Sequence, residues 1–246
     1  MPRRNPSIAE QSPGEGCTPI ACKDCGVYRL CHPGDGEEAP DLPHGIVKRK
    51  RTLKRGETLY RAGEPFRNIY AIRYGSVKTS LVTDDGRVQV TGFHIAGELL
   101  GLSAIVTGRY NCEAKALEAA GVCEVRFDQF GELSRQLPSL QYQMLQIMSQ
   151  ELLHNQELML LLGKKNAKER LATYLLNLSQ RFEKRACSYT RFNLTMSRSD
   201  IGNYLGLAEE TVCRIFSLFH EEGLVTTRSR QIQLNDLDRL KAIARG

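Results

Sequence analysis

The stretch 197-SRSDIGNYLGLAEETVCRIFSLFHEEGLV-225 carries two apolar patterns of helical spacing, one on each side of Gly206. The apolar positions are Ile201, Leu205 and Leu207 in the first pattern and Val212, Ile215, Phe216 and Phe219 in the second. Ser197 stands three residues before Asp200, a spacing typical of a helix start, and the second pattern ends at Gly223. A glycine between two short amphipathic helices permits the sharp turn that joins them. The stretch therefore predicts a helix-turn-helix.

The flanking residues extend this motif into a domain over 164–246. Upstream, four apolar residues recur with helical spacing: Leu171, Tyr174, Leu175 and Leu178. Downstream, residues 225–234 (VTTRSRQIQL) alternate as in a hairpin with Arg228 and Arg230 near its tip, so we expect the motif to be winged. The segment has 15 basic and 9 acidic residues. This positive excess suits a polyanionic partner such as nucleic acid.

A long helix is predicted directly before this domain, over residues 137–163. Pro138 begins the stretch, and no further glycine or proline occurs before Gly163. Six residues alternate by three and four positions: Leu145, Met148, Leu152, Asn155, Met159 and Leu162. This spacing is typical of a coiled-coil seam and favours a homodimer. A helix packed on the roll of its own chain would carry a similar stripe.

Residues 45–136 read as an antiparallel β-roll. Segments rich in β-branched and aromatic residues, such as NIYAIRYGSVKTSLV (68–82) and VQVTGFHI (88–95), are separated by turns that contain glycine. Short strands at such intervals are typical of an antiparallel barrel or roll. The chain is therefore expected to be an α+β protein with a sensor-like roll, a dimerisation helix and a winged helix-turn-helix.

Composition limits where the protein works. No run of about 18 apolar residues occurs, and the N-terminus has no apolar core of the kind a signal peptide needs. We therefore expect a cytoplasmic protein without a membrane partner. In a reducing compartment the eight cysteines are expected to remain thiols or to bind metal.

Residues 1–44 form a glycine-, proline- and cysteine-rich arm that lacks apolar periodicity. Its spacing Cys22-x2-Cys25-x5-Cys31 offers three thiolates, which suit a zinc ion or an iron–sulfur cluster once a fourth ligand is added. Spacing alone leaves both metals open. The Cys22-x2-Cys25 pair would also suit a thiol oxidoreductase, but no βαβ pattern surrounds it.

Six stretches along residues 17–240 resemble the fumarate and nitrate reduction regulators, the FNR branch of the cyclic-AMP receptor protein superfamily. The stretches are CKDCGVYRLC (22–31), IYAIRYGSVKT (69–79), TGFHIAGELLGLSAI (91–105), VCEV (122–125), LLLGKKNAKERLA (160–172) and LTMSRSDIGNYLGL (194–207). The resemblance implies a [4Fe–4S] cluster held by Cys22, Cys25, Cys31 and Cys123.

The same resemblance implies a function. It predicts an oxygen-responsive transcription regulator, mainly an activator and not an enzyme. With its cluster at low oxygen the protein would dimerise and bind TTGAT-like inverted repeats in double-stranded DNA, upstream of genes for anaerobic or low-oxygen respiration. Oxygen would convert the cluster to a smaller form and release the dimer. RNA polymerase is an implied partner, with the turn at residues 83–86 (TDDG) as a candidate contact.

In the second helix of the motif, the family pattern Glu-x-x-Ser-Arg becomes Glu210-Thr211-Val212-Cys213-Arg214. Glutamate can accept from cytosine and arginine can form two bonds to guanine, so Glu210 and Arg214 are expected to read bases. Cys213 replaces the usual serine, which puts the preference at one base pair in doubt. Candidate phosphate contacts are Ser197, Arg198, Ser199, Arg228 and Arg230.

A cyclic-nucleotide effector remains an alternative. Residues 96–99 (AGEL) resemble the start of a phosphate-binding cassette, which needs an arginine, usually followed by serine or threonine, about ten residues later. Arg109 is followed by Tyr110, Asn111 and Cys112 instead, which weakens this interpretation. The same DNA-binding fold with a zinc arm or a nucleotide effector is therefore the second hypothesis.

Overall fold

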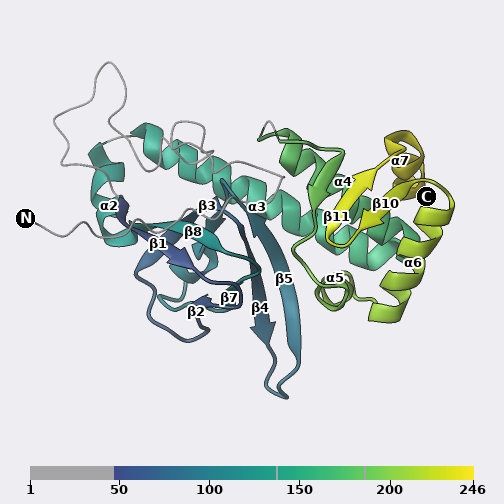
Figure 1. Ribbon diagram of the computed structural model, residues 1–246. Coiled ribbons are helices and arrows are strands. Elements are labelled where there is room, and N and C mark those ends of the chain that lie inside the picture. Colours follow the sequence, from purple (N-terminus) through teal and green to yellow (C-terminus); the bar gives the residue numbers. More distant parts are fainter. Residues whose placement is uncertain (1–46, 137, 186) are drawn as a thin grey trace, which may run out of the picture.

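The first module is a roll of two four-stranded antiparallel sheets (Figure 1). The computed structural model describes residues 47–136, 138–185 and 187–246. One sheet has the strand order β1-β8-β3-β6 and the other β2-β7-β4-β5. The strands are β1 Val47–Leu53, β2 Thr58–Tyr60, β3 Asn68–Tyr74, β4 Ser76–Val82, β5 Val88–Ile95, β6 Leu99–Leu100, β7 Glu113–Ala116 and β8 Ala120–Arg126. The predicted antiparallel roll is confirmed.

The apolar run in β3 reflects burial on both faces of its sheet. Tyr70 and Ile72 point into the interior of the roll, whereas Ile69 and Ala71 belong to a second apolar layer on the outer face. A strand covered on both sides needs no polar face, so its apolar residues are consecutive rather than alternating. The outer layer is covered by the start of a long helix, through Leu140.

Two helices follow the roll: α2 Phe127–Gln136 and α3 Pro138–Lys164. The strand pattern carried no signal for α2, but the long helix after Pro138 is confirmed. Its inner stripe consists of Leu140, Met144, Ile147, Glu151, His154, Leu158 and Leu161. None of the helices in the described residues is both long and apolar enough to cross a membrane.

The second module is a winged helix-turn-helix. Its elements are α4 Ala167–Glu183, β9 Arg191–Asn193, α5 Arg198–Leu205, α6 Glu209–Glu221, β10 Val225–Arg228, β11 Gln231–Leu234 and α7 Leu237–Arg245. Gly206 adopts φ 65°, a left-handed conformation that ends α5 without a Cβ penalty. The predicted motif and wing are confirmed, and β9 adds a third strand that pairs with β11.

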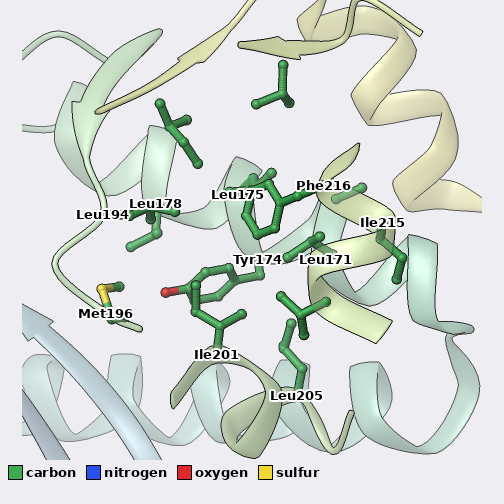
Figure 2. Packing of buried hydrophobic residues seen from close by; sticks show 14 of the residues in the cluster. Leu171, Tyr174, Leu175, Leu178, Leu194, Met196, Ile201, Leu205, Ile215 and Phe216 are labelled. Carbon is green, nitrogen blue, oxygen red and sulfur yellow. The ribbon is translucent and has the colours of Figure 1, made fainter. Parts of the chain in front are cut away.

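The core of this module lies between α4, α5 and α6. Figure 2 shows Leu171 and Leu175 of α4 facing Ile201 and Leu205 of α5, with Phe216 of α6 beside them. All five side chains are buried. Because each helix contributes one apolar face to a shared cluster, the spacing visible in the sequence becomes the packing of the motif.

The two modules share this core. Val90 and Phe93 of β5 and Leu117 are buried in the same cluster as the helix-turn-helix. The Phe93 ring lies 6.0 Å from the Tyr174 ring and 5.2 Å from the Tyr204 ring, centroid to centroid. Strand β5 therefore runs beside α5 and joins the roll to the second module (Figure 1).

Candidate DNA-binding surface and metal-ligating cysteine

Helix α6 presents one polar face to solvent. Glu210, Cys213 and Arg214 are exposed, while the inward residues of the same helix are buried: Val212, Ile215, Phe216 and Phe219. The structure thus brings the two predicted base-reading side chains, Glu210 and Arg214, onto one open face together with Cys213. A helix with such a face fits the major groove of DNA.

Arg214 lies beside the start of α4. A groove is lined by the N-cap residue Asn166 and by Lys168 of α4, together with Arg214, Ser217 and Glu221 of α6. Lys168 was missed in the sequence, where a single lysine near a helix start carries no distinctive signal. Its position next to Arg214 adds a second positive charge to the reading side of the module.

The candidate phosphate contacts at the start of α5 differ in their surroundings. Ser197 caps the helix, because its Oγ accepts a hydrogen bond from the Asp200 backbone N at 2.9 Å. Ser199 is exposed. The Arg198 guanidinium lies 3.4 Å from the centroid of the Phe216 ring, and burial lowers the pKa of Arg198. Arg198 is therefore held against α6 rather than extended into solvent.

The two wing arginines also lie in different settings. Arg228 and Arg230 are both exposed and flank Ser229, which adopts φ 55° at the hairpin tip. Arg230 lies within electrostatic reach of Glu118 in the roll: burial raises the pKa of Glu118, and the Ser76 hydroxyl and Arg230 oppose that rise. Arg228 is thus the wing residue that is more available to a ligand.

Cys123 occupies the layer between the roll and α3. It lies in β8, 6% exposed, in a cluster with Leu140 and Met144 of α3. Its partners across the sheet are Lys50 on β1 and Ala71 on β3. Because Ala71 is small, little side-chain bulk stands next to Cys123 on that side.

The other predicted ligands, Cys22, Cys25 and Cys31, lie outside the described residues. Within the described part of the chain, no three histidine, cysteine or acidic residues gather in a way that could hold a metal. Thiolate is the donor that iron–sulfur clusters and zinc prefer, and Cys123 is a buried thiol on the strand next to β1. On donor chemistry and position, Cys123 fits a shared metal site.

The predicted seam faces solvent. Five of its members are exposed: Leu145, Met148, Leu152, Asn155 and Met159. Leu162 is half-buried and packs against the core of the second module. Further apolar side chains extend the exposed patch, among them Tyr142, Leu153 and Leu160. An apolar patch of this length on one helix is typical of a protein interface.

Comparison with known proteins places both modules. A cyclic nucleotide-binding domain model matches residues 50–136, and a Crp-like helix-turn-helix domain model matches residues 169–243. The transcriptional activator protein Anr of Pseudomonas aeruginosa is 48% identical over 92% of this chain and 93% of its own length. The chain belongs to the FNR family of the cyclic-AMP receptor protein superfamily.

Other relatives agree with this assignment to the FNR family. The fumarate and nitrate reduction regulatory protein of Escherichia coli is 42% identical over 93% of this chain and 92% of its own length. The structure of FixK2 from Bradyrhizobium japonicum superposes with a TM-score of 0.73 at 31% identity, covering 79% of this chain and 96% of FixK2. These relatives confirm that the chain is a transcription regulator of this family and not an enzyme.

Three tyrosines pack together among the aliphatic residues inside this FNR-family roll. The rings of Tyr60 and Tyr110 stack at 4.0 Å between centroids, and Tyr70 lies 5.7 Å from Tyr60. Arg109 Nη1 donates to the Gly63 carbonyl at 2.7 Å, in an exposed position. The arginine considered for a cyclic phosphate is therefore engaged outside the roll.

The FNR-family chain also contains an ionic cluster that sequence reasoning missed. Glu98, in the turn between β5 and β6, accepts hydrogen bonds from Arg181 of α4 and from Arg185 just beyond the end of that helix. The sequence contained one hint, because residues 96–99 resembled the start of a nucleotide cassette whose arginine, Arg109, is not followed by the usual serine or threonine. The structure points this carboxylate at the second module instead.

Proposed function

We propose that the chain is an oxygen-responsive transcription activator of the cytoplasm. It holds a [4Fe–4S] cluster through Cys22, Cys25, Cys31 and Cys123 and, as a homodimer, binds TTGAT-like inverted repeats that control genes for anaerobic or low-oxygen respiration. The observation that carries this proposal is the position of Cys123. One layer joins this buried thiol to the inner face of α3, and the opposite face of α3 is the exposed apolar stripe.

The topology supports a ligand set shared between the arm and the roll. β1 is an edge strand that pairs with β8, with Val47 opposite Val125. The arm thus enters the described structure on the strand beside Cys123. Cys31 precedes Val47 by 16 residues, which span up to about 50 Å when extended. The arm thiols are therefore within reach of Cys123.

When bound, the cluster supplies a cross-link between four thiolates that oxygen breaks. The residues of the chain transmit its presence. Cys123 contributes to the same apolar layer as Leu140 and Met144, so a ligand held at Cys123 restrains the first turns of α3. Because the exposed stripe lies on that helix, ordering α3 favours pairing with a second copy of the chain.

The DNA contacts follow from the open face of α6. In a symmetric dimer, two such helices read half-sites about one helical turn apart. Glu210 and Arg214 provide base contacts, and Arg228 provides a phosphate contact. The exposed turn at residues 83–86 (TDDG), at the tip of the β4–β5 hairpin, is the proposed contact for RNA polymerase.

The alternatives find less support. The tyrosine stack in the roll and the outward bond of Arg109 do not favour a cyclic nucleotide. A thiol oxidoreductase would leave the winged helix-turn-helix without a role. A zinc arm uses the same thiolates, so it is separated from the cluster by metal analysis.

Anaerobic purification tests the cofactor. Wild type is expected to be brown and to contain iron and acid-labile sulfide. Cys123→Ser is expected to lose both, because a hydroxyl binds iron poorly. Cys112→Ser is the matched control, since Cys112 is also buried in the roll but packs in the inner core beside Tyr60. Colourless protein that contains zinc, or a Cys123→Ser variant with full iron, would contradict the proposal.

A further inference from the structure

The turn at residues 96–99 (AGEL) directs its carboxylate out of the roll. Leu99 and Leu100 pack in the apolar layers, but Glu98 Oε2 accepts from the Ile95 backbone N at 3.0 Å and from Arg181 Nη2 at 2.6 Å. Glu98 Oε1 accepts from Arg181 Nε at 2.9 Å and from Arg185 Nη2 at 2.8 Å. Both oxygens thus accept hydrogen bonds, from the backbone at Ile95, from Arg181 of α4 and from Arg185 just after that helix. We call Glu98, Arg181 and Arg185 the Glu98 cluster.

The Glu98 cluster is sheltered from water and stays charged. The side chains of Glu98, Arg181 and Arg185 are 20%, 18% and 15% exposed. Burial raises the pKa of Glu98, but the charge and hydrogen bonds of Arg181 outweigh that effect and hold it at about 2. Arg181 also donates to the Phe93 carbonyl at 2.5 Å. A fork that binds a carboxylate and a backbone carbonyl together fixes direction as well as distance.

The inner stripe of helix α3 changes from apolar to polar residues near the Glu98 cluster. Its inner stripe is apolar at Leu140 against the roll and again at Leu161 in the core of the second module. Between them lie Glu151 and His154. Burial raises the pKa of Glu151 and lowers the pKa of His154, and the charges of Glu98 and Arg181 also act on both residues. The roll and α4 therefore meet at the Glu98 cluster, and the polar part of α3 lies within electrostatic range of it.

The docked arrangement leaves the reading face open. Polar contacts from the roll to α5 include that of Asp200, which pairs with Lys78 at 2.5 Å, and that of Asn203, which bonds to the backbone of Val88 and Val90. The base-reading side chains of α6 remain exposed. Docking of the two modules is thus compatible with DNA reading, and it sets the direction of α6 relative to α3.

We propose that Glu98 is a positioning residue, which fixes the angle between the dimerisation helix and the recognition helix and thereby the spacing of half-sites that the dimer accepts. This inference rests on the proposed DNA-binding dimer. A two-fold dimer reads two half-sites only when its recognition helices are held one turn apart. Without the ion pairs of the Glu98 cluster, α4 would rotate more freely about residues 164–166, and each recognition helix would sample several orientations.

The test uses full-length protein that carries its iron–sulfur cluster, together with synthetic DNA duplexes. The first duplex carries two inverted TTGAT half-sites whose centres lie about one helical turn apart. The other two have one base pair added or removed between the half-sites. Glu98→Gln keeps the size of the side chain but loses the charge, and Arg181→Lys keeps the charge but loses the fork. Glu57→Gln is the matched control, since Glu57 pairs with Arg51 within the roll. Anaerobic fluorescence titration measures the affinity for each duplex.

Wild type and Glu57→Gln are expected to prefer one spacing clearly. Glu98→Gln and Arg181→Lys should bind the preferred duplex about tenfold more weakly, which corresponds to about 1.4 kcal/mol, and should lose much of the discrimination between spacings. The double variant should be little worse than either single one, because the two residues act through each other. Iron content and sedimentation should match those of wild type.

A purely structural role for Glu98 has a different signature. Loss of folded protein lowers affinity for all three duplexes by one common factor and leaves the spacing preference intact, which would overturn the inference. Arg185→Gln leaves the Arg181 pairing with Glu98 in place and removes the two bonds of Arg185, to Glu98 Oε1 and to the Arg181 carbonyl. It provides a milder variant if Glu98→Gln folds poorly. Failure of wild type to bind any duplex would instead overturn the proposed function, and this inference with it.

Discussion

Single residues on the DNA-facing side differ in the kind of contact they can make. Arg214 lies on the open face of α6 and lines a groove together with Lys168. These neighbours limit the directions from which a base can meet its guanidinium. Arg228 is exposed at the end of a strand. A positioned arginine can recognise the edge of a base, whereas an exposed wing arginine suits a phosphate.

Arg214→Ala is therefore expected to change sequence preference, and Arg228→Ala to change general affinity. Loss of a bidentate contact to guanine costs roughly 1–3 kcal/mol per half-site. Loss of a phosphate contact weakens binding to all sequences alike and flattens the salt dependence. Binding-site selection with each variant measures both effects. Unchanged selection by Arg214→Ala and by Glu210→Ala would mean that α6 does not read the bases.

Cys213→Ser is the matched variant for base reading. Serine restores the hydroxyl of the family pattern on the same exposed position. We expect sharper selection at the neighbouring base pair, with unchanged iron content and dimerisation, because Cys213 lies on α6 and far along the chain from the proposed ligands. Identical selection by serine and cysteine would remove this side chain from the reading set.

His94 links pH to stability. Burial lowers the pKa of His94 to about 4 from 6.5. Glu98 opposes that change, while Arg181 and His154 add to it. At pH 5 the unfolded chain thus binds a proton that the folded chain does not. Stability is full above pH 6.5 and declines as the pH falls toward 4, with a slope of at most about 1.4 kcal/mol for each step of one in pH.

His94→Gln should remove much of this acid sensitivity. Glutamine does not titrate and can keep a hydrogen bond to Thr79 Oγ1, which lies 3.2 Å from His94 Nε2. Urea unfolding at pH 5 and pH 7 measures the difference, at values where Glu98 stays ionised. His220→Gln serves as the control because His220 is exposed on α6. An equal loss of stability between pH 7 and pH 5 in wild type and His94→Gln would contradict the assignment.

Among the secondary-structure elements, α3 carries two stripes with different tasks. The inner stripe packs Leu140 against the roll and Leu161 against the second module. The outer stripe contains Leu152 at 61% and Met159 at 73% exposure. The helix is thus apolar on two sides. The inner side is buried against the same chain, and the outer side is exposed. This explains why the sequence has the spacing of a dimer seam although one side of the helix packs within its own chain.

Asn155 tests the outer stripe as the dimer seam. An aspartate at this position would face its symmetry mate, and two like charges at a seam repel. Asn155→Asp is therefore expected to weaken dimerisation of the cluster-free protein, measured by sedimentation equilibrium. Gln150→Asp is the control, because it adds the same charge to an exposed position of α3 outside the stripe. Equal or stronger association of Asn155→Asp would refute the seam assignment.

In the molecule as a whole, the roll and the DNA-binding module are expected to unfold together. Phe93 of β5 is 4% exposed and packs on Tyr174 and Tyr204 of the other module. Phe93→Ala should lower stability by about 3–5 kcal/mol and divide one calorimetric transition into two. Val106→Ala, at a position 90% exposed, should change neither. A single transition in Phe93→Ala would show that other contacts suffice to couple the modules.

Sequence patterns predicted the elements that depend on neighbours along the chain. The turn at Gly206, the cap at Ser197 and the wing around Arg228 all follow from spacing within about ten residues, and the structure contains each of them. The helix α2 was missed because its ten residues follow β8 without a break. The three arm cysteines remain predictions, because they lie outside the described residues.

Most of the elements, and the family to which they belong, could be predicted from the amino-acid sequence, because periodicity and caps are local properties of the chain. Three other features emerged from the packing of the fold: the position of Cys123 against α3, the contact of Arg198 with Phe216, and the pairing of Glu98 with Arg181, 83 residues apart. Contacts of this kind depend on how strands and helices pack. A carboxylate in a turn has the same local pattern whether it faces water, a nucleotide or an arginine of another module.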